Sequence, residues 1–508
     1  MSDVTTERPG PYVSTAGLPA EASAARDAAP GADGVWAPGR RRLTAGLVLT
    51  ITLVAFESLA IATVMPVVSD DLGGLGLYGW VFSGFFLGNL LGIVLAGEAA
   101  DRRGTRVPFL AGLVLFSIGL VIGGSAQSMA GLVAGRVAQG IGAGVIPAVA
   151  YASVGRGYLP ELRPRVFAVF SSAWVIPGLL GPAAASAIER WTSWRIVFLA
   201  LLPFVALAAA MALPALSNTA PAPGGGRDDT GDGGVRAPGR TGLPRRGGVG
   251  PDRTRRRDAV VLVAGVALVL GGLGAHQAPL AVALVSAGVP PAAWAFARLV
   301  PTGTIRLRPG LPSAVAVRGI LTFAFFGADA YVSLAITDVR DQPTWVAGMA
   351  LTGATLAWTT GAWIQQRLVN ERGPRWLVRR GFVLVAIGIA GLAVAIDSSV
   401  PVAVAIAAWT VAGMGMGLAY APLSVTVLGT AAAGQEGSAS ASLQLTDVLG
   451  VSLGTGLAGV FLAVGDGRGW STSTSLTLAF AMTLAVAAGG VWAGRRLPQA
   501  LPGVAGAR

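Results

Sequence analysis

The chain has 508 residues, of which 53% are apolar and only 12% are charged, and its formal net charge at pH 7 is +12. An ordinary soluble domain carries about 25% charged residues, so this composition predicts a protein that lies in a lipid bilayer. Cysteine is absent and there is one His, which excludes disulfides and multi-histidine metal centres. We expect no metal and no cofactor. Because all 37 basic residues are Arg, a Walker-type phosphate loop, which needs a Lys, is also excluded.

The first segment, residues 1–42, is rich in Ala, Gly and Pro and is predicted to be a disordered tail. Arg40, Arg41 and Arg42 directly precede the first apolar run. The positive-inside rule places such Arg clusters in the cytoplasm. The positive net charge is therefore interpreted as a topology signal, and we expect no nucleic-acid partner.

Two sets of apolar stretches are long enough to span a membrane, which takes roughly 20 residues. The first six are 43–66, 79–100, 106–126, 130–153, 165–188 and 195–215. The last six are 314–337, 344–366, 376–396, 401–427, 438–464 and 471–493. The pattern predicts an all-α membrane protein with an N-terminal six-helix bundle over 43–215, a C-terminal six-helix bundle over 314–494 and a tail over 495–508. A basic linker over 216–258 follows the first bundle.

The stretch 259–300 lies between the linker and the second bundle. Its part from Ala259 to Ala297 contains no Asp, Glu or Arg, and it is too long for one span and about right for two. We expect two extra helices here and fourteen spans in all. The alternative is one helix with a re-entrant or interfacial piece, which leaves twelve or thirteen.

The loop charges predict the orientation of the chain. If the N-terminus is cytoplasmic, the inner loops carry the excess of Arg, as at Arg102 and Arg103, while outer loops carry acids such as Asp70 and Asp71. This is the distribution that the positive-inside rule requires. We expect a multi-pass protein of the cell membrane with both termini in the cytoplasm. Two extra central helices leave this parity unchanged.

The loop after the second predicted helix carries Gly97, Asp101, Arg102, Gly104 and Arg106 at a recognisable spacing. This string resembles the loop 2–3 signature of the major facilitator superfamily, although Val107 replaces its last basic residue. The resemblance implies two six-helix bundles related by a pseudo-two-fold axis along the membrane normal. It also implies that Asp101 and the Arg residues act as a charge latch that gates the transporter.

Two further helices resemble proton-coupled members of the superfamily. The fourth predicted helix carries Arg136, Gln139 and Gly140 in the pattern Arg-x-x-Gln-Gly, which in the family is tied to proton coupling. The first carries Glu57, which resembles the acidic residue of the fourteen-helix drug:proton antiporters. An ionisable residue inside a membrane is costly and is a functional-site hypothesis by default.

The fifth predicted helix matches the antiporter signature in part, through Pro177, Gly181 and Pro182. Pro177 stands where the family has an earlier glycine, and Ala185 and Ser186 replace its final glycine pair. The antiporter resemblance is therefore incomplete at this helix. An importer or facilitator for a metabolite stays open as an alternative.

Four charged residues stand out within the predicted spans: Glu57, Arg136, Asp329 and Asp447. Glu57 and Arg136 lie at similar predicted depths and are expected to pair or to share a pocket. Asp329 and Asp447 each lie eleven residues after a charged residue at the inner helix end, which places both about 16 Å deep, near the midplane. Three acids against one Arg predict a cavity that favours cationic or neutral lipophilic compounds. The alternative for each Asp is a hydrogen bond between helices.

These observations predict a protein that is not an enzyme. The leading hypothesis is proton-coupled secondary active efflux of small lipophilic, cationic or neutral compounds by alternating access. The alternative of another class is a membrane sensor or scaffold that does not transport. The expected partners are a small-molecule substrate, protons and the lipid bilayer, and we expect a monomer.

Overall fold

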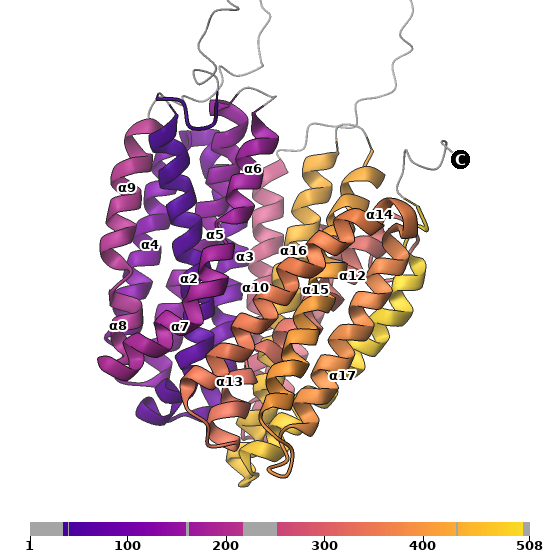
Figure 1. Cartoon of the computed structure of the whole chain (residues 1–508). Helices are drawn as coiled ribbons and strands as arrows, with labels where there is room; N and C mark the ends of the chain where they lie inside the picture. The colour runs from indigo at the N-terminus through magenta and orange to yellow at the C-terminus, as the bar shows by residue number, and fades with distance from the viewer. Residues whose placement is uncertain (1–33, 39, 159–161, 217–250, 433–434, 501–508) are drawn as a thin grey trace, which may run out of the picture.

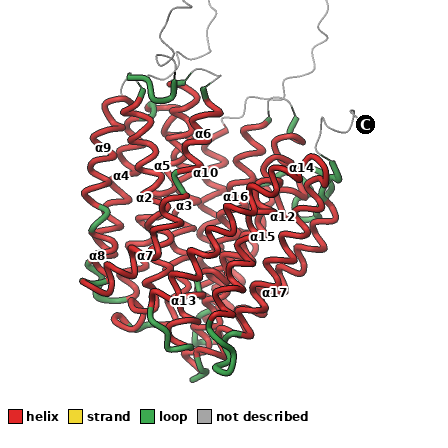
Figure 2. The backbone as a smooth tube through the Cα atoms, in the orientation of Figure 1, coloured by secondary structure: helices red, strands yellow, loops and turns green. Residues whose placement is uncertain are grey.

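The computed structural model describes residues 34–38, 40–158, 162–216, 251–432 and 435–500. Regular secondary structure in these ranges is helical, without a strand (Figure 2). The helices form two bundles that stand side by side, with α10 between them (Figure 1). The predicted all-α fold is therefore confirmed. Most of the predicted tail 1–42 and of the linker 216–258 falls outside the described residues.

The first bundle contains the helices from α2 to α9. They are α2 (Arg41–Leu72), η1 (Leu75–Leu77), α3 (Tyr78–Arg103), α4 (Arg106–Gly124), α5 (Met129–Gly157), α6 (Arg163–Ser172), α7 (Val175–Trp191), α8 (Trp194–Leu199) and α9 (Leu202–Leu216). The first helix continues through Pro66, which the sequence had suggested as its end. The predicted helices 165–188 and 195–215 each break in two. In both, a proline, Pro177 or Pro203, lies in the first turn of the second piece, where the missing N–H costs nothing.

The stretch between the bundles forms a helical hairpin of α10 (Pro251–Leu273) and α11 (Ala278–Leu299). The helix α10 begins within the predicted linker, because its charged first turns precede the apolar stretch. The hairpin is joined by an ion pair in which Arg298 Nε lies 2.8 Å from Asp258 Oδ2.

The same hairpin packs against both bundles. Its Leu262 and Leu270 share a buried apolar cluster with Leu87 of α3 and Leu449 of α16. Eleven helices of the described residues, α11 among them, are long and apolar enough to cross a membrane. The chain is thus a multi-pass membrane protein, and a count of fourteen rather than twelve spans stays a prediction.

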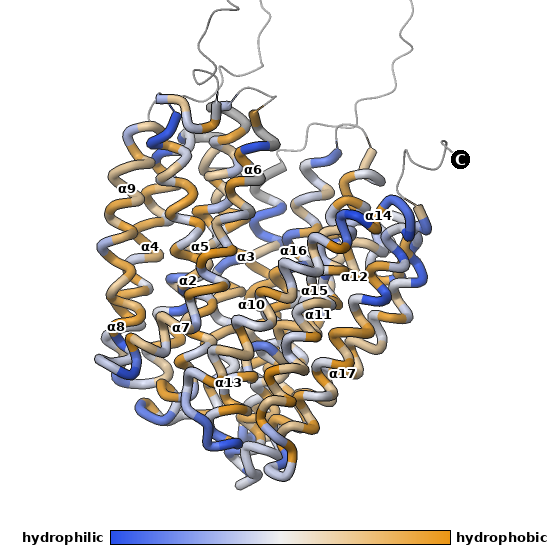
Figure 3. Tube along the Cα trace, in the orientation of Figure 1, coloured by the Kyte–Doolittle hydropathy of each residue, from blue (hydrophilic) through white to orange (hydrophobic). Residues whose placement is uncertain are grey.

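The second bundle contains the helices from α12 to α17. They are α12 (Leu311–Asp329), α13 (Val332–Leu334), η2 (Ala335–Val339), α14 (Thr344–Val394), α15 (Ala403–Thr430), α16 (Glu436–Arg468), α17 (Thr472–Ala493) and η3 (Gly494–Arg496). The predicted helices 344–366 and 376–396 are the two arms of α14, which meet at Gly373. This residue has φ 74° and precedes Pro374, a combination that kinks a helix. Hydrophobic residues make up most of each helix, and hydrophilic residues are most frequent towards the two ends of the molecule (Figure 3).

One contact between the two bundles lies at the end of the molecule away from the start of α2, where the bundles converge in Figure 1. Here α3 and α16 approach so closely that a Cβ atom on Gly79 would lie 2.6 Å from Gly459 Cα. Tyr331 donates a hydrogen bond of 2.6 Å to the carbonyl oxygen of Thr455. We call the contact among Gly79, Tyr331, Thr455 and Gly459 the far-side contact. It closes this end of the interface between the bundles.

We predict that Gly79→Ala opens the far-side contact. The added methyl group overlaps backbone, and such overpacking costs about 1–3 kcal/mol, which corresponds to a population shift of roughly 5- to 150-fold. Because the chain has no Cys, a single Ser333→Cys, buried at this end, reports the opening. Its labelling by a water-soluble maleimide should accelerate in the Gly79→Ala background.

The matched control is Gly437→Ala, because a Cβ atom at that glycine meets nothing within 4 Å. It should leave the labelling of Ser333→Cys unchanged. Equal labelling in the Gly79→Ala background would show that the far-side contact does not close the interface.

Candidate functional site

The first polar group in the interior lies in the N-terminal bundle, where Arg136 of α5 forms an ion pair with Glu57 of α2. Arg136 Nη1 also donates a hydrogen bond of 2.8 Å to Gln139 Oε1, and its Nε donates one of 3.1 Å to the carbonyl oxygen of Val81. The guanidinium lies 4.2 Å from the ring centroid of Phe85. The group therefore ties three helices together.

The local sequence explains why these side chains meet. A Cβ atom on Gly140 would lie 2.0 Å from the carbonyl oxygen of Phe85, so only glycine lets α5 pack this closely against α3. One turn earlier, Arg136 consequently lies beside α3. The exposed fractions of Glu57, Arg136 and Gln139 are 2%, 1% and 0%, so the group is occluded.

Two polar atoms of this group have no partner within the described part of the chain. They are Glu57 Oε2 and Gln139 Nε2, and both are buried. A buried polar atom without a hydrogen bond costs about 1–3 kcal/mol. The carboxylate thus keeps one free acceptor, which is what the binding of a proton or of a substrate cation requires.

Asp329 lies at the end of α12 in the C-terminal bundle. Trp409 Nε1 of α15 donates a hydrogen bond of 2.9 Å to Asp329 Oδ1. The ring of Trp409 stacks on Phe325, with ring centroids 5.0 Å apart. Of the three acids named from the sequence, Asp329 is the one without an Arg partner in the described residues.

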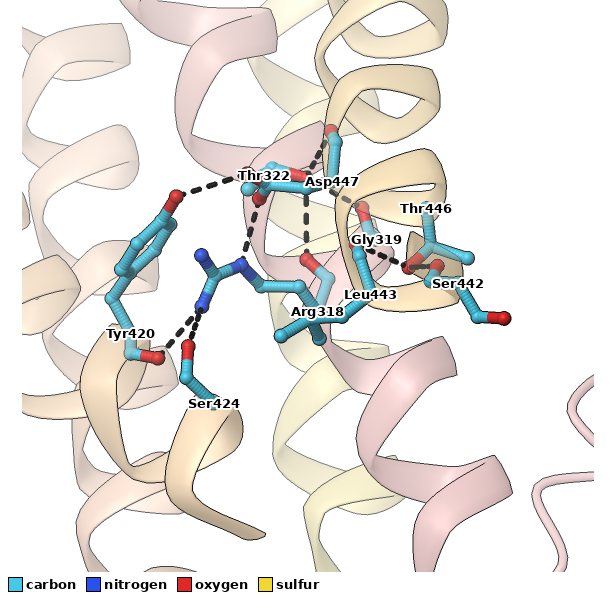
Figure 4. A network of polar contacts seen from close by, with 9 residues as sticks. All are labelled: Arg318, Gly319, Thr322, Tyr420, Ser424, Ser442, Leu443, Thr446 and Asp447. Carbon is cyan, nitrogen blue, oxygen red and sulfur yellow. Dashed lines mark hydrogen bonds and ion pairs between the residues drawn. The ribbon is translucent and has the colours of Figure 1, made fainter. Parts of the chain in front are cut away.

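Asp447 of α16 takes part in a second ion pair, which the sequence did not reveal. Arg318 Nε of α12 lies 2.7 Å from Asp447 Oδ1, and the Tyr420 hydroxyl donates a hydrogen bond of 2.9 Å to Asp447 Oδ2 (Figure 4). Arg318 was interpreted as a residue at the helix end. The helix begins at Leu311 with Pro312 in its first turn, a start signal that places Arg318 seven residues inside.

This ion pair corrects the charge balance expected from the sequence. Arg318 is 4% exposed and Arg136 is 1% exposed, so among the described residues the interior holds two buried Arg side chains where one was predicted. Two of the three acids are therefore neutralised by direct partners. The argument that three acids face one Arg was wrong, because it depended on the position of a helix start.

The predicted equal depth of Asp329 and Asp447 was also wrong. Asp447 lies eleven residues after the start of α16, which is about 16 Å along the axis. Asp329 lies eighteen residues after the start of α12, which is about 27 Å. The two helices lie in register at Thr322, which donates a hydrogen bond of 3.0 Å to the carbonyl oxygen of Asp447. Asp329 therefore lies nearer the far-side contact than Asp447 does.

The pair of Glu57 and Arg136 lies at the level of the far-side contact. Arg136 binds the carbonyl oxygen of Val81, two residues after Gly79. On the other side of the interface, Tyr331 lies two residues after Asp329. It donates a hydrogen bond to the carbonyl oxygen of Thr455 at this level. Glu57 and Asp329 thus lie at a similar depth on the two bundles, and Asp447 lies closer to the opposite end.

The two motif segments are placed as follows. Gly97, Asp101 and Arg102 belong to the last turns of α3, and the side chains of Asp101 and Arg102 lie outside the described residues. Gly104, with φ 71°, ends α3, and Arg106 begins α4 with an exposed side chain. The charge latch of this loop stays a prediction.

The antiporter-like segment forms the first half of α7, where Pro177, Gly181 and Pro182 are buried. A Cβ atom on Gly181 would lie 3.7 Å from Leu59 Cβ of α2. This face of α7 therefore packs against the helix that carries Glu57. Among the described residues, no group of three His, Asp or Glu side chains could hold a metal ion.

Residues 47–455 match the Major Facilitator Superfamily. The chain belongs to this superfamily. It is a transporter and not an enzyme, and the family assignment made from its loop and helix motifs is confirmed.

Curated relatives of the chain include multidrug transporters. Multidrug resistance protein 3 of Bacillus subtilis is 32% identical over 162 residues, which are 32% of this chain and 32% of the relative. The multidrug efflux pump SdrM of Staphylococcus aureus is 27% identical over 162 residues, which are 32% of this chain and 36% of that protein. The similarity thus spans about a third of the length of each relative.

Solved structures show the same fold at low sequence identity. An auto-inhibited peptide transporter of the POT family has a TM-score of 0.63 at 14% identity, covering 91% of this chain and 98% of that one. A D-xylose–proton symporter has a TM-score of 0.60 at 14% identity, covering 90% of this chain and 98% of that one. These likenesses show that the chain shares its fold with these transporters over 90–91% of its length.

We predict that Arg136→Gln destabilises the protein more than the double change Glu57→Gln with Arg136→Gln. The single change leaves the Glu57 carboxylate buried without a counter-charge, and breaking a buried ion pair on one side costs about 3–5 kcal/mol. The double change removes both charges and should recover most of the loss. The measurement is the melting temperature of the purified protein in detergent.

The matched control is Arg195→Gln, which breaks the ion pair with Asp71. In this pair the side chain of Arg195 is 35% exposed and that of Asp71 is 47% exposed. An exposed pair contributes about 0–1 kcal/mol, so the melting temperature should hardly change. If Arg136→Gln and Arg195→Gln had equal effects, the buried pair would not stabilise the fold.

Proposed function

We propose that the protein exports small lipophilic, cationic or neutral compounds in exchange for protons, by alternating access. The observation that carries this proposal is the occluded group of Glu57, Arg136 and Gln139 at the level where the bundles meet. Support comes from the superfamily and from relatives named as multidrug transporters. The proposed location is the cell membrane, with a monomer as the working unit.

The proposed chemistry at Glu57 is competition between two cations for one carboxylate. A proton or the positive group of a substrate neutralises Glu57, and release of one permits binding of the other, which is enough to give antiport. Arg136 holds one oxygen of Glu57 and so sets how strongly the free oxygen attracts a cation. Gln139 positions the guanidinium. A neutral substrate moves when the proton alone exchanges at Glu57.

In the proposed cycle, this structure is the conformation that is open to the cytoplasm. The positive-inside rule places the tails and the linker in the cytoplasm. The far-side contact then closes the outer face, and the bundles accept substrate from the cytoplasm, as an exporter requires. We propose that the latch at Asp101 and Arg102 controls the return to the outward-facing state. Asp329 and Asp447 are proposed to face the substrate in the second bundle.

The alternative within transport is an importer or facilitator of a metabolite. It is favoured by Pro177, Ala185 and Ser186, which depart from the antiporter signature in α7. The direction of proton-driven movement in proteoliposomes separates the two functions. A sensor or scaffold without transport is set aside, because the chain belongs to a superfamily of transporters.

We predict that Glu57→Gln abolishes the release of protons when tetraphenylphosphonium is added to the purified protein in detergent. Gln keeps the size and hydrogen bonding of Glu but cannot titrate. The variant should also lose export of this cation from proteoliposomes when a proton gradient is imposed. An imposed sodium gradient should drive no export by either the parent protein or the variant.

Glu436→Gln is the control, because this acid lies exposed at the start of α16. It should release protons as the parent does. Proton release and export at parental levels by Glu57→Gln would remove Glu57 from the mechanism and make Asp329 the next candidate.

We predict that Asp101→Asn lowers the turnover of transport while the protein stays folded in the membrane. The reason is the proposed latch at the end of α3, whose charge pairing favours one access state. The measurement is initial export rate per folded protein, with Asp466→Asn, an exposed acid at the opposite end, as the control. Parental turnover in Asp101→Asn would contradict a gating role.

A further inference from the structure

The ion pair of Arg318 and Asp447 differs from that of Glu57 and Arg136 in its access. The side chain of Asp447 is 21% exposed and that of Arg318 is 5% exposed, whereas those of Glu57 and Arg136 are 3% and 1% exposed. Asp447 also lies further from the closed far-side contact. Asp447 is therefore the more accessible carboxylate in the conformation in which Glu57 is occluded.

Arg318 has hydrogen-bonding capacity to spare. Its Nε binds Asp447, and its Nη1 donates hydrogen bonds of 2.7 Å to the Tyr420 carbonyl oxygen and 3.3 Å to Ser424 Oγ. In the described part of the chain, Nη2 has no hydrogen-bond partner, and Figure 4 shows this nitrogen without a dashed line. A guanidinium presents its donors as a planar fork that matches a carboxylate.

An aromatic surface adjoins the pair. The guanidinium of Arg318 lies 3.0 Å from the ring centroid of Tyr420, and the ring of Trp358 lies 5.3 Å from that of Tyr420. Both rings are partly buried. A ligand that reaches the pair can therefore place an aromatic group against Trp358 and Tyr420.

We propose that Arg318 and Asp447 form a binding site for zwitterionic compounds, which carry a carboxylate and an ammonium group close together. The ligand carboxylate binds Arg318 and its ammonium binds Asp447, so the ligand replaces the internal ion pair. Arg318 Nε lies 2.7 Å from Asp447 Oδ1, so the two side chains face each other. A ligand whose carboxylate and ammonium groups are attached to one carbon, as in an α-amino acid, can therefore contact both.

The physical reason for this preference is charge compensation. A cation that draws Asp447 away leaves the buried Arg318 without a counter-charge, and an anion that binds Arg318 leaves Asp447 uncompensated. A buried charge without a partner is strongly unfavourable. A zwitterion satisfies both partners at once. Since a buried ion pair gives little net stability over apolar side chains, ligand recognition also gives a reason for its presence.

This inference rests on the proposed function for its role in export, but the site is tested by binding alone. The probes are tryptophan, its methyl ester and N-acetyltryptophan, which share one ring system. In a buffer acidic enough to protonate the amine of the ester, they are zwitterionic, cationic and anionic, respectively. Equilibrium binding of the radiolabelled probes to the full-length protein in detergent should be at least tenfold tighter for tryptophan than for either derivative.

The variants assign the preference to the pair. Arg318→Gln should lower the affinity for tryptophan to that for the methyl ester. Asp447→Asn should lower the affinity for tryptophan to that for N-acetyltryptophan. The double change Arg318→Gln with Asp447→Asn leaves no charge unpaired, so it should fold and bind the three probes equally. Arg298→Gln, which breaks the Arg–Asp pair between α10 and α11, should keep the preference for tryptophan.

Two results would overturn the proposal: equal binding of the three probes by the parent, or a preference for tryptophan that persists in the folded double variant. Tighter binding of the methyl ester would assign the site to cations instead. Export of tetraphenylphosphonium is scored separately. If the parent protein prefers tryptophan but does not export tetraphenylphosphonium, proton-driven efflux is refuted and the site is kept. If it exports tetraphenylphosphonium but shows no preference for tryptophan, the site alone is refuted.

Discussion

The interior of this protein is organised by the cost of a charge in a medium that cannot solvate it. Among the described residues, each of the two buried guanidinium groups, those of Arg136 and Arg318, lies against a carboxylate, a backbone carbonyl and an aromatic ring. These partners come from several helices, so satisfying one charge fixes the relative positions of those helices. The buried ion pairs thus fix how the helices of each bundle are positioned against one another.

Close packing of backbones provides the second constraint. In lipid there is no hydrophobic force between helices, so their association depends on van der Waals contact and on small residues that let backbones approach. The pairs α3–α5 and α3–α16 approach through glycine. The first approach brings Arg136 to Val81 within one bundle, and the second joins the bundles. The helix α3 therefore belongs both to the polar group of the first bundle and to the interface.

The sequence predicted the fold through patterns that do not depend on tertiary contacts, and these include the apolar runs and the loop signature. It also predicted that Glu57 and Arg136 pair or share a pocket, although the depth of Glu57 was counted from Pro66 and α2 continues to Leu72. Arg318 was missed because an apolar run does not say where a helix starts, and Pro312 was the signal that did. Asp329 was misplaced for the same reason. The breaks before α7 and α9 follow from prolines whose effect depends on their position in a turn.

The helical hairpin of α10 and α11 has a mechanical consequence for motion between the bundles. It lies along α16 from Ser442, which donates a hydrogen bond to Leu299, to Gly467, beside His276. It also contacts α3 of the other bundle through Leu87. Because the hairpin packs against both bundles, it restrains their relative motion along one edge of the interface between them. Any relative motion of the two bundles must therefore carry the hairpin along or slide past it at the edge where α3 meets α16.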